Sequence, residues 1–206
     1  MHPEPASHTD GSDPVAPERA APAAAGQGPA SPEPVAPDPD DKDWTWTLTR
    51  TCPECGFDAA AIERVAIPAL IRDAVSRFPD VLARADATER PSAQTWSALE
   101  YACHVRDVCR VFTERVELIQ GEDHPHFPNW DQDATALEQH YAAQDPQVVS
   151  VELAASGEAA AVAFTHVRND EWERAGLRSN GSEFTVESLG RYFLHDLFHH
   201  VWDIKG

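Results

Sequence analysis

The sequence predicts an all-α protein built as a four-helix bundle, and three observations lead to this prediction. Four long segments after residue 58 repeat their apolar residues at helical spacing. Each of these segments begins with residues that favour the start of a helix. Only one short stretch, residues 44–49, alternates apolar and polar residues as a β-strand does. Long helices without a set of strands to pack on are typical of a helix bundle.

The first 43 residues differ in composition from the rest of the chain. They hold ten of the 17 prolines and no Phe, Trp, Tyr, Leu or Ile. Such a segment buries too little apolar surface to offset the entropy of ordering it, so we predict a disordered acidic Pro/Ala-rich tail over residues 1–43. Residues 44–57 are predicted to form an extended arm, or a short strand at its start. The bundle itself is predicted to span residues 58–206.

The first half of the bundle is marked by caps and prolines. Asp58 is expected to cap a short helix. Pro68 suits the first turn of the next helical stretch, which Pro79 is expected to kink. Ser97 and Glu100 have the spacing of a capping box, which predicts the start of a long third helix.

The second half continues the same pattern. The third helix is expected to end near residue 120, before a polar loop over residues 121–133. A helix of about ten residues is expected near 134–143, because the segment is short and lacks breakers. Asp145 and Pro146 predict the start of a long helix that ends near residue 167. Thr185 is placed to cap the last helix, which runs to the end of the chain.

Charge and composition exclude several classes of function. The chain has 35 acidic and 16 basic side chains, for a formal charge of −19. Because phosphate groups are bound by basic surfaces, we expect no nucleic-acid partner and no docking on anionic membranes. The sequence shows neither an apolar run of about 18 residues nor a secretory signal, so we expect no membrane span. The four cysteines are too few for a disulfide scaffold and favour a cytoplasmic location.

Helical phase, at about 100° per residue, places three ligand-type side chains on buried faces. His104 falls in the apolar arc of the third helix, and Asp196 and His200 fall in the apolar stripe of the last helix. Asp196 and His200 are four residues apart, so they are neighbours on one face. A carboxylate and two imidazoles facing one another suit a divalent metal ion with positions left for water or substrate. The alternative is a buried Asp–His hydrogen-bond network that fixes the register of the bundle.

His195 and His199 have the same spacing as Asp196 and His200 and compete with them as ligands. Phase places His195 on the outer side of the last helix, facing solvent or a neighbouring loop, and His199 on the flank. We therefore treat His199 as an alternative ligand or as a residue that orients one. Asp203 also lies near the buried stripe and is assigned the same supporting role.

The Cys52-Pro53-Glu54-Cys55 motif resembles half of a zinc ribbon. A complete site needs two further soft ligands. Cys103 and Cys109 are six residues apart on a predicted helix and do not form a second knuckle. Three interpretations of Cys52 and Cys55 therefore stay open: a free or reversibly oxidised dithiol, a partial metal site, or a structural pair.

Two stretches resemble the DinB-like four-helix bundles, which include the mycothiol-dependent maleylpyruvate isomerase type and related thiol transferases. The first is WSALEYACHVRD, in which His104 follows Trp96 by eight residues, as the ligand histidine of that family does. The second is HDLFHHVWDI at the end of the chain. Aligning its Trp202-Asp203 pair with the isomerase type assigns the ligand carboxylate to Asp196 and the ligand imidazole to His200. The resemblance covers roughly residues 60–204.

The resemblance implies an up-down-down-up bundle that binds a divalent metal, often zinc or nickel. The chain departs from the family at Asp196, where relatives have His or Glu. Because Asp is one methylene shorter than Glu, the metal would lie closer to this helix, which keeps His199 as a substitute ligand. In this topology the 121–145 connection returns to the end of the bundle that carries His104, so Trp130 and Asp131 could line the mouth of the site.

The function implied by the resemblance is that of a metal-dependent thiol transferase or isomerase. It would use a low-molecular-weight thiol, with mycothiol as the candidate, on a small electrophile. Two alternatives remain: a non-catalytic metal-binding or stress-response bundle, and a purely structural bundle. A cavity that reaches the metal would favour catalysis. Arg106 and Arg110 are expected to face solvent rather than hold a substrate, and the oligomeric state, including a homodimer, is open.

Overall fold

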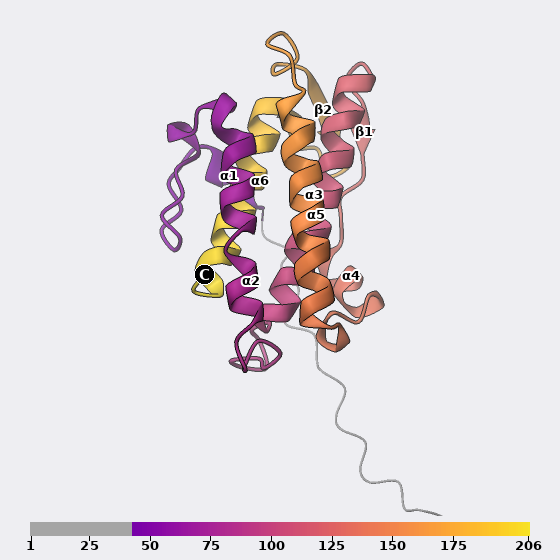
Figure 1. Cartoon of the computed structure of the whole chain (residues 1–206). Helices are drawn as coiled ribbons and strands as arrows, with labels where there is room; N and C mark the ends of the chain where they lie inside the picture. The colour runs from indigo at the N-terminus through magenta and orange to yellow at the C-terminus, as the bar shows by residue number, and fades with distance from the viewer. Residues whose placement is uncertain (1–42) are drawn as a thin grey trace, which may run out of the picture. The chain divides into compact units, whose positions relative to one another are not determined.

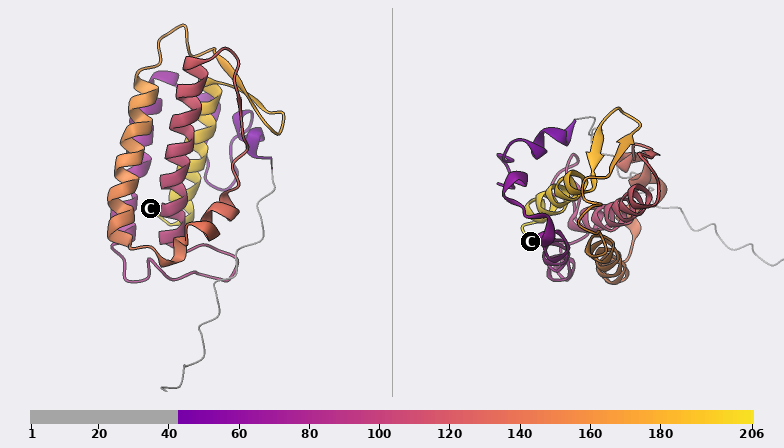
Figure 2. Two further views of the ribbon diagram at one scale, coloured as in Figure 1. Left: turned by 90° about the vertical axis from the view of Figure 1, so that its right-hand side faces the viewer. Right: turned by 90° about the horizontal axis from the view of Figure 1, so that it is seen from above.

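The computed structural model describes residues 43–206. The predicted disordered tail, apart from Asp43, lies outside the described residues. Within them, four helical segments pack side by side as a bundle (Figures 1 and 2). These segments are α1 (Ile67–Val75) continued by α2 (Phe78–Leu82), α3 (Ala98–Gly121), α5 (Pro146–Thr165) and α6 (Val186–Asp203). The predicted helical bundle is therefore confirmed.

The helix starts and the first break follow the local sequence. The Ser97 side chain accepts a hydrogen bond from the Glu100 amide, and the Glu100 carboxylate accepts one from the Ser97 amide, so the capping box is present. Thr185 caps α6 in the same way with Ser188. The predicted kink is a full break between α1 and α2. Proline clashes with the carbonyl four residues earlier, and α1 ends at Val75, four residues before Pro79.

The segment predicted as a strand, residues 44–49, instead forms a 3-10 helix, η1 (Trp44–Leu48). The Asp43 carboxylate accepts a hydrogen bond from the Thr45 amide, and the Thr47 hydroxyl donates one to the Trp44 carbonyl. A strand here would have no neighbouring strand to supply its backbone hydrogen bonds. The local bonds of the 3-10 helix satisfy backbone groups instead. Two further short 3-10 helices follow, η2 (Ala59–Ala61) and η3 (Arg64–Ala66), and η1 packs against α6.

A small sheet, which the sequence did not predict, ties two connections together. Strand β1 (His126–Phe127) pairs in parallel with β2 (Ala175–Arg178), and β2 pairs antiparallel with β3 (Glu183–Thr185). Gly181, at a φ of 91°, makes the tight turn between β2 and β3. The sheet fixes the segment that leaves α3 next to the segment that leads into α6.

The connection between α3 and α5 runs back along the bundle to the end where α3 begins (Figure 1). It carries α4 (Gln132–Glu138) and the 3-10 helix η4 (Tyr141–Ala143). The predicted helix at 134–143 is therefore divided in two. His140, at a φ of 51°, is in the left-handed region and ends the helical path between the two pieces.

By length and composition alone, helix α5 is long and apolar enough to cross a membrane. No such segment was expected from the sequence. Its apolar side chains have another role, because α5 packs against both α1 and α3. Val149, Leu153 and Phe164 are buried in the core of the bundle. The core thus accounts for part of the hydropathy of α5, since 44% of the apolar window is buried.

Candidate metal centre

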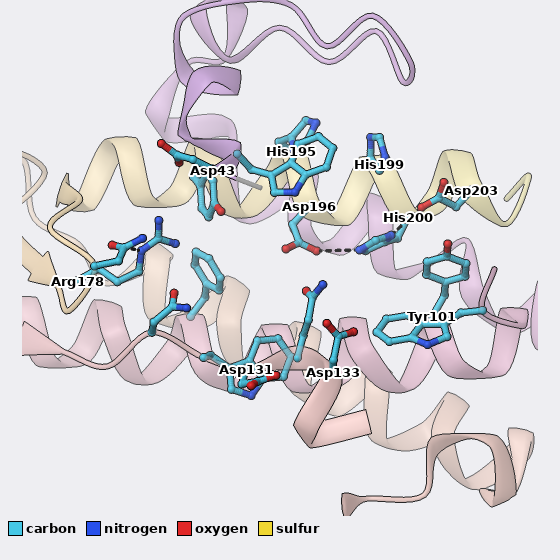
Figure 3. Close-up of a pocket in the computed structure, with 18 of the residues that line it drawn as sticks. Asp43, Tyr101, Asp131, Asp133, Arg178, His195, Asp196, His199, His200 and Asp203 are labelled. Atoms are coloured by element: carbon cyan, nitrogen blue, oxygen red, sulfur yellow. Dashed lines mark hydrogen bonds and ion pairs between the residues drawn. The ribbon is translucent and has the colours of Figure 1, made fainter. Parts of the chain in front are cut away.

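His104 on α3 and the pair Asp196 and His200 on α6 meet inside the bundle. The Nε2 atoms of His104 and His200 each lie 3.3 Å from Oδ1 of Asp196. The two imidazole rings have centroids 4.8 Å apart. One ligand atom from each residue lies within 4.8 Å of the other two. Figure 3 shows Asp196 and His200 side by side along α6.

These three residues have the chemistry and spacing that a divalent ion requires. Ligand bonds of about 2.0–2.2 Å in a tetrahedral site put neighbouring ligand atoms about 3.3–3.6 Å apart, close to the observed 3.3 Å. Nδ1 of His200 lies 2.8 Å from Oδ2 of Asp203. That contact holds the ring so that Nε2 points at Asp196, as carboxylates commonly do for metal-binding histidines.

The charge states of the three residues follow from their burial and from one another. Burial by itself would raise the pKa of Asp196, but hydrogen bonds and charge from His104 and His200 lower it far below its usual value. The side chain is therefore an ionised carboxylate. Burial lowers the pKa of His104. Burial by itself would lower the pKa of His200, but the carboxylates of Asp196 and Asp203 raise it to about 9. A metal binds a carboxylate and neutral imidazoles, so binding at this centre would release a proton from His200.

A cavity of about 630 Å³ opens beside these residues. Asp196 and His200 line it, together with Tyr101 on α3. Trp130 and Asp131 from the α3–α5 connection also line it, as predicted, and the Trp130 ring stacks on His104 with centroids 5.4 Å apart. Through Asp196 and His200 the three-residue group is thus open to a space large enough for a small molecule.

The opposite end of the cavity carries two buried arginines, Arg115 and Arg178, each 7% exposed. Figure 3 shows Arg178 at the end away from His200. Arg115 donates to the Pro128 carbonyl, and Arg178 donates to the Asn180 side chain. Within residues 43–206 neither guanidinium forms an ion pair.

Burial and the charge of the neighbouring Arg178 change the pKa of Arg115. Burial, with the repulsion of Arg178, lowers the pKa of Arg115 to about 10, so it stays charged at neutral pH. Neither arginine was predicted from the sequence to belong to the site. Arg115 carried a signal, because at about 100° per residue it falls at about 320° relative to Tyr101, inside the same apolar arc as His104. Arg178 lies on the unpredicted sheet and gave no such signal.

His195 and His199 point away from the group around His104, toward the N-terminal segment, and they also line the cavity (Figure 3). His195 is 4% exposed and faces the N-terminal segment, with its ring centroid 5.8 Å from those of Trp44 and Phe57. Nδ1 of His199 lies 3.8 Å from the Cys52 sulfur. Neither histidine belongs to the group around His104. The buried position of His195 arises because residues 44–57 cover the helix face that phase alone had placed outside.

Arg106 was expected to face solvent, and that prediction is wrong. It is buried and pairs with Asp107, whose carboxylate also accepts a hydrogen bond from the Tyr141 hydroxyl. Glu152 on α5 completes the pairing at 2.8 Å. The polar face of α3 is covered by α5 and the α3–α5 connection, so its charges pair with one another. Arg110 is half-exposed, and neither Arg106 nor Arg110 lines the cavity.

Comparison with known proteins supports the fold and identifies the family. A solved structure, YfiT from Bacillus subtilis, superimposes with a TM-score of 0.62 at 14% identity, covering 70% of this chain and 87% of that one. YfiT is described as a probable metal-dependent hydrolase with an unusual four-helix bundle topology. At this identity the likeness shows the fold alone. No curated protein matches the chain. The sequence model of the DinB superfamily matches residues 68–204, most of the bundle, and the chain therefore belongs to the DinB superfamily.

Proposed function

We propose that this protein is a metal-dependent enzyme that acts on a small anionic molecule. The observation that carries the proposal is the cavity beside His104, Asp196 and His200. A structural metal site is closed over by protein, whereas a catalytic one keeps a position open to substrate. Here Asp196 and His200 line a cavity of about 630 Å³.

His104, Asp196 and His200 would hold a divalent ion, with zinc and nickel as the candidates. Such an ion would act as a Lewis acid and lower the pKa of a thiol or water molecule bound to it. Asp203 keeps the His200 ring in position through its 2.8 Å contact with Nδ1. Trp96 and Trp130 enclose the His104 ring, with centroids 5.5 and 5.4 Å away, and limit the access of water to it.

Arg115 and Arg178 would bind the anionic group of the substrate. A buried guanidinium without a carboxylate partner is costly, and a bound carboxylate would supply one through charge-assisted hydrogen bonds. Both guanidiniums are held over aromatic rings, Arg115 over Phe127 at 5.1 Å and Arg178 over Phe184 at 5.2 Å. This arrangement keeps the donors in place before the substrate arrives.

The nucleophile in this proposal is a low-molecular-weight thiol, with mycothiol as the candidate, and the reaction is a thiol transfer or an isomerisation. Among the described residues that line the cavity there is no Cys, Ser, Thr or Lys, so they supply no thiol, alcohol or amine nucleophile there. In this proposal a second molecule brings the thiol. We also propose a cytoplasmic location, where such thiols remain reduced.

Hydrolysis is the second candidate, and the description of YfiT favours it. The two reactions differ in one requirement that can be measured. A thiol transferase consumes an unsaturated dicarboxylate only when a thiol is present, whereas a hydrolase cleaves a carboxylate-bearing ester without one. The full chain loaded with zinc or nickel should be assayed with mycothiol, glutathione and cysteine, and with esters alone.

We expect thiol-dependent turnover that His200→Ala abolishes and that His166→Ala, at an exposed position outside the cavity, leaves intact. Thiol-independent ester cleavage would establish the hydrolase instead. Bound metal without either activity would favour a non-catalytic metal-binding bundle, and a chain that binds no metal would favour a structural Asp–His network.

A further inference from the structure

A second group of metal-ligand side chains lies on a neighbouring face of α6. Cys52 and Cys55 come from the N-terminal segment, and His195 and His199 come from α6. One ligand atom from each of the four lies within 4.8 Å of the other three. All four cysteines in the chain are free thiols.

The local structure on both sides presents these ligands together. The backbone turns sharply after Cys55, where Gly56 adopts a φ of 74° and its amide donates to the Cys52 carbonyl at 2.9 Å. This turn places both sulfurs on one side. His195 and His199 are one helical turn apart and share a face. The resulting C-x2-C and H-x3-H spacings are those of Cys2His2 zinc sites.

Two histidine side chains, one buried and one half-buried, support a ligand at this position. Nε2 of His195 is buried without a hydrogen-bond partner among the described residues, which is costly unless a ligand satisfies it. Nε2 of His199 lies 3.4 Å from the Glu54 carboxylate, which leaves Nδ1 facing the Cys52 sulfur at 3.8 Å. In a tetrahedral zinc site a sulfur and a nitrogen are about 3.6 Å apart.

We propose that Cys52, Cys55, His195 and His199 bind a structural zinc ion. Four protein ligands fill a tetrahedral coordination sphere and leave no position for a substrate. The ion would fasten residues 44–57 to α6, 140 residues later in the chain. Two of the ligands, His195 and His199, line the cavity, as do Trp44 and Glu54 of that segment, so the zinc site would itself form part of one wall.

Cobalt substitution tests the proposal, because thiolate ligands give Co²⁺ a charge-transfer band in the near ultraviolet that His and Asp ligands do not. The metal-free full chain should be titrated with Co²⁺. We expect the band in the wild type, and we expect the Cys52→Ala/Cys55→Ala variant to lose it together with one bound ion per chain. Cys109→Ala, which removes a buried cysteine outside the group, should keep the band.

The His104→Ala/His200→Ala variant separates this site from the proposed catalytic one. It should lose the other ion and keep the thiolate band. If the proposed function is wrong, the thiolate band is still observed. If the zinc proposal is wrong, the band is absent. A wild-type chain that binds cobalt without the band overturns the proposal.

A measurement on the unmodified chain covers the case in which the cysteine variant does not fold. The wild-type protein should be alkylated with iodoacetamide, with zinc and after chelation, and the modified residues found by mass spectrometry. We expect zinc to protect Cys52 and Cys55, and chelation to expose them. Equal reactivity in both conditions, or a Cys52–Cys55 disulfide in zinc-loaded protein, would overturn the proposal.

Discussion

The Nδ1 atom of His199 lies 3.8 Å from the sulfur of Cys52, 147 residues earlier in the chain. The next residue, His200, points the other way and places Nε2 3.3 Å from Asp196. Adjacent residues on a helix are offset by about 100°, so α6 can present two ligand pairs to two different neighbours. His195 and His199 face the N-terminal segment, and Asp196 and His200 face α3. The two pairs are therefore not alternatives for one ion.

Asp203→Asn should weaken metal binding at the centre without removing it. The carboxylate of Asp203 orients His200 and touches no other proposed ligand. Loss of such a supporting group typically costs about 10–100-fold in metal affinity. Isothermal titration with zinc should show this loss, while His200→Ala removes the binding event of this centre alone and exposed His166→Ala changes nothing. An Asp203→Asn chain with wild-type affinity would show that the carboxylate plays no part.

Arg115→Gln and Arg178→Gln should impair the use of carboxylate substrates. Each substitution removes a buried charge that lines the cavity and leaves a shorter, neutral polar group. A hydrogen bond to a charged group contributes about 1.5–3 kcal/mol, so kcat/KM should fall by roughly 10–150-fold. Steady-state kinetics with the acid and its methyl ester should show the loss for the acid only. Arg110→Gln, outside the cavity, is the control, and an equal effect on the ester would contradict the anion-binding role.

Asp107→Ala should destabilise the bundle at neutral pH, and the difference from the wild type should shrink in acid. Burial alone would raise the pKa of Asp107, but hydrogen bonds from Arg106 and Tyr141 and the nearby arginine charges lower it overall. A carboxyl whose folded pKa is depressed stabilises the fold above its unfolded pKa of about 4, and this contribution is lost as the pH falls through the folded value. Breaking a buried ion pair costs about 3–5 kcal/mol.

Urea unfolding at pH 7 and near pH 3 measures this difference directly. Glu117→Ala, at an exposed position on the same helix, should change stability little at either pH. A difference between Asp107→Ala and the wild type that stays constant down to pH 3 would show that ionisation of Asp107 does not contribute.

Gly157→Ala should destabilise the contact between α5 and α1. A Cβ at Gly157 would lie 2.7 Å from a γ-methyl group of Val75, whose branched side chain has little freedom to move. Overpacking of this kind costs about 1–3 kcal/mol. Thermal unfolding should show a lower midpoint for Gly157→Ala and partial recovery in the Gly157→Ala/Val75→Ala double variant. If the double variant loses more stability than the two single variants lose together, the steric origin is contradicted.

The sequence by itself determined the features that depend on residues within a few turns of one another. Caps and prolines act on the nearest backbone groups, so they set the helix boundaries locally. The caps at Ser97 and Thr185 mark where α3 and α6 begin, and Pro79 marks the break after α1. Helical phase brought His104 and the pair Asp196 and His200 to buried faces for the same reason. A period of 3.6 residues is a local property of the chain.

The tertiary structure alone decided which segment covers each remaining face. The pairing of His195 and His199 with Cys52 and Cys55 depends on where residues 44–57 cross α6. No local pattern encodes that crossing, since it rests on contacts between distant residues. The burial of Arg106 under α5, and the position of Arg178 on a sheet between two connections, have the same origin. A helix sequence specifies which side chains share a face, but the path of the rest of the chain determines whether that face meets solvent, a core or a ligand.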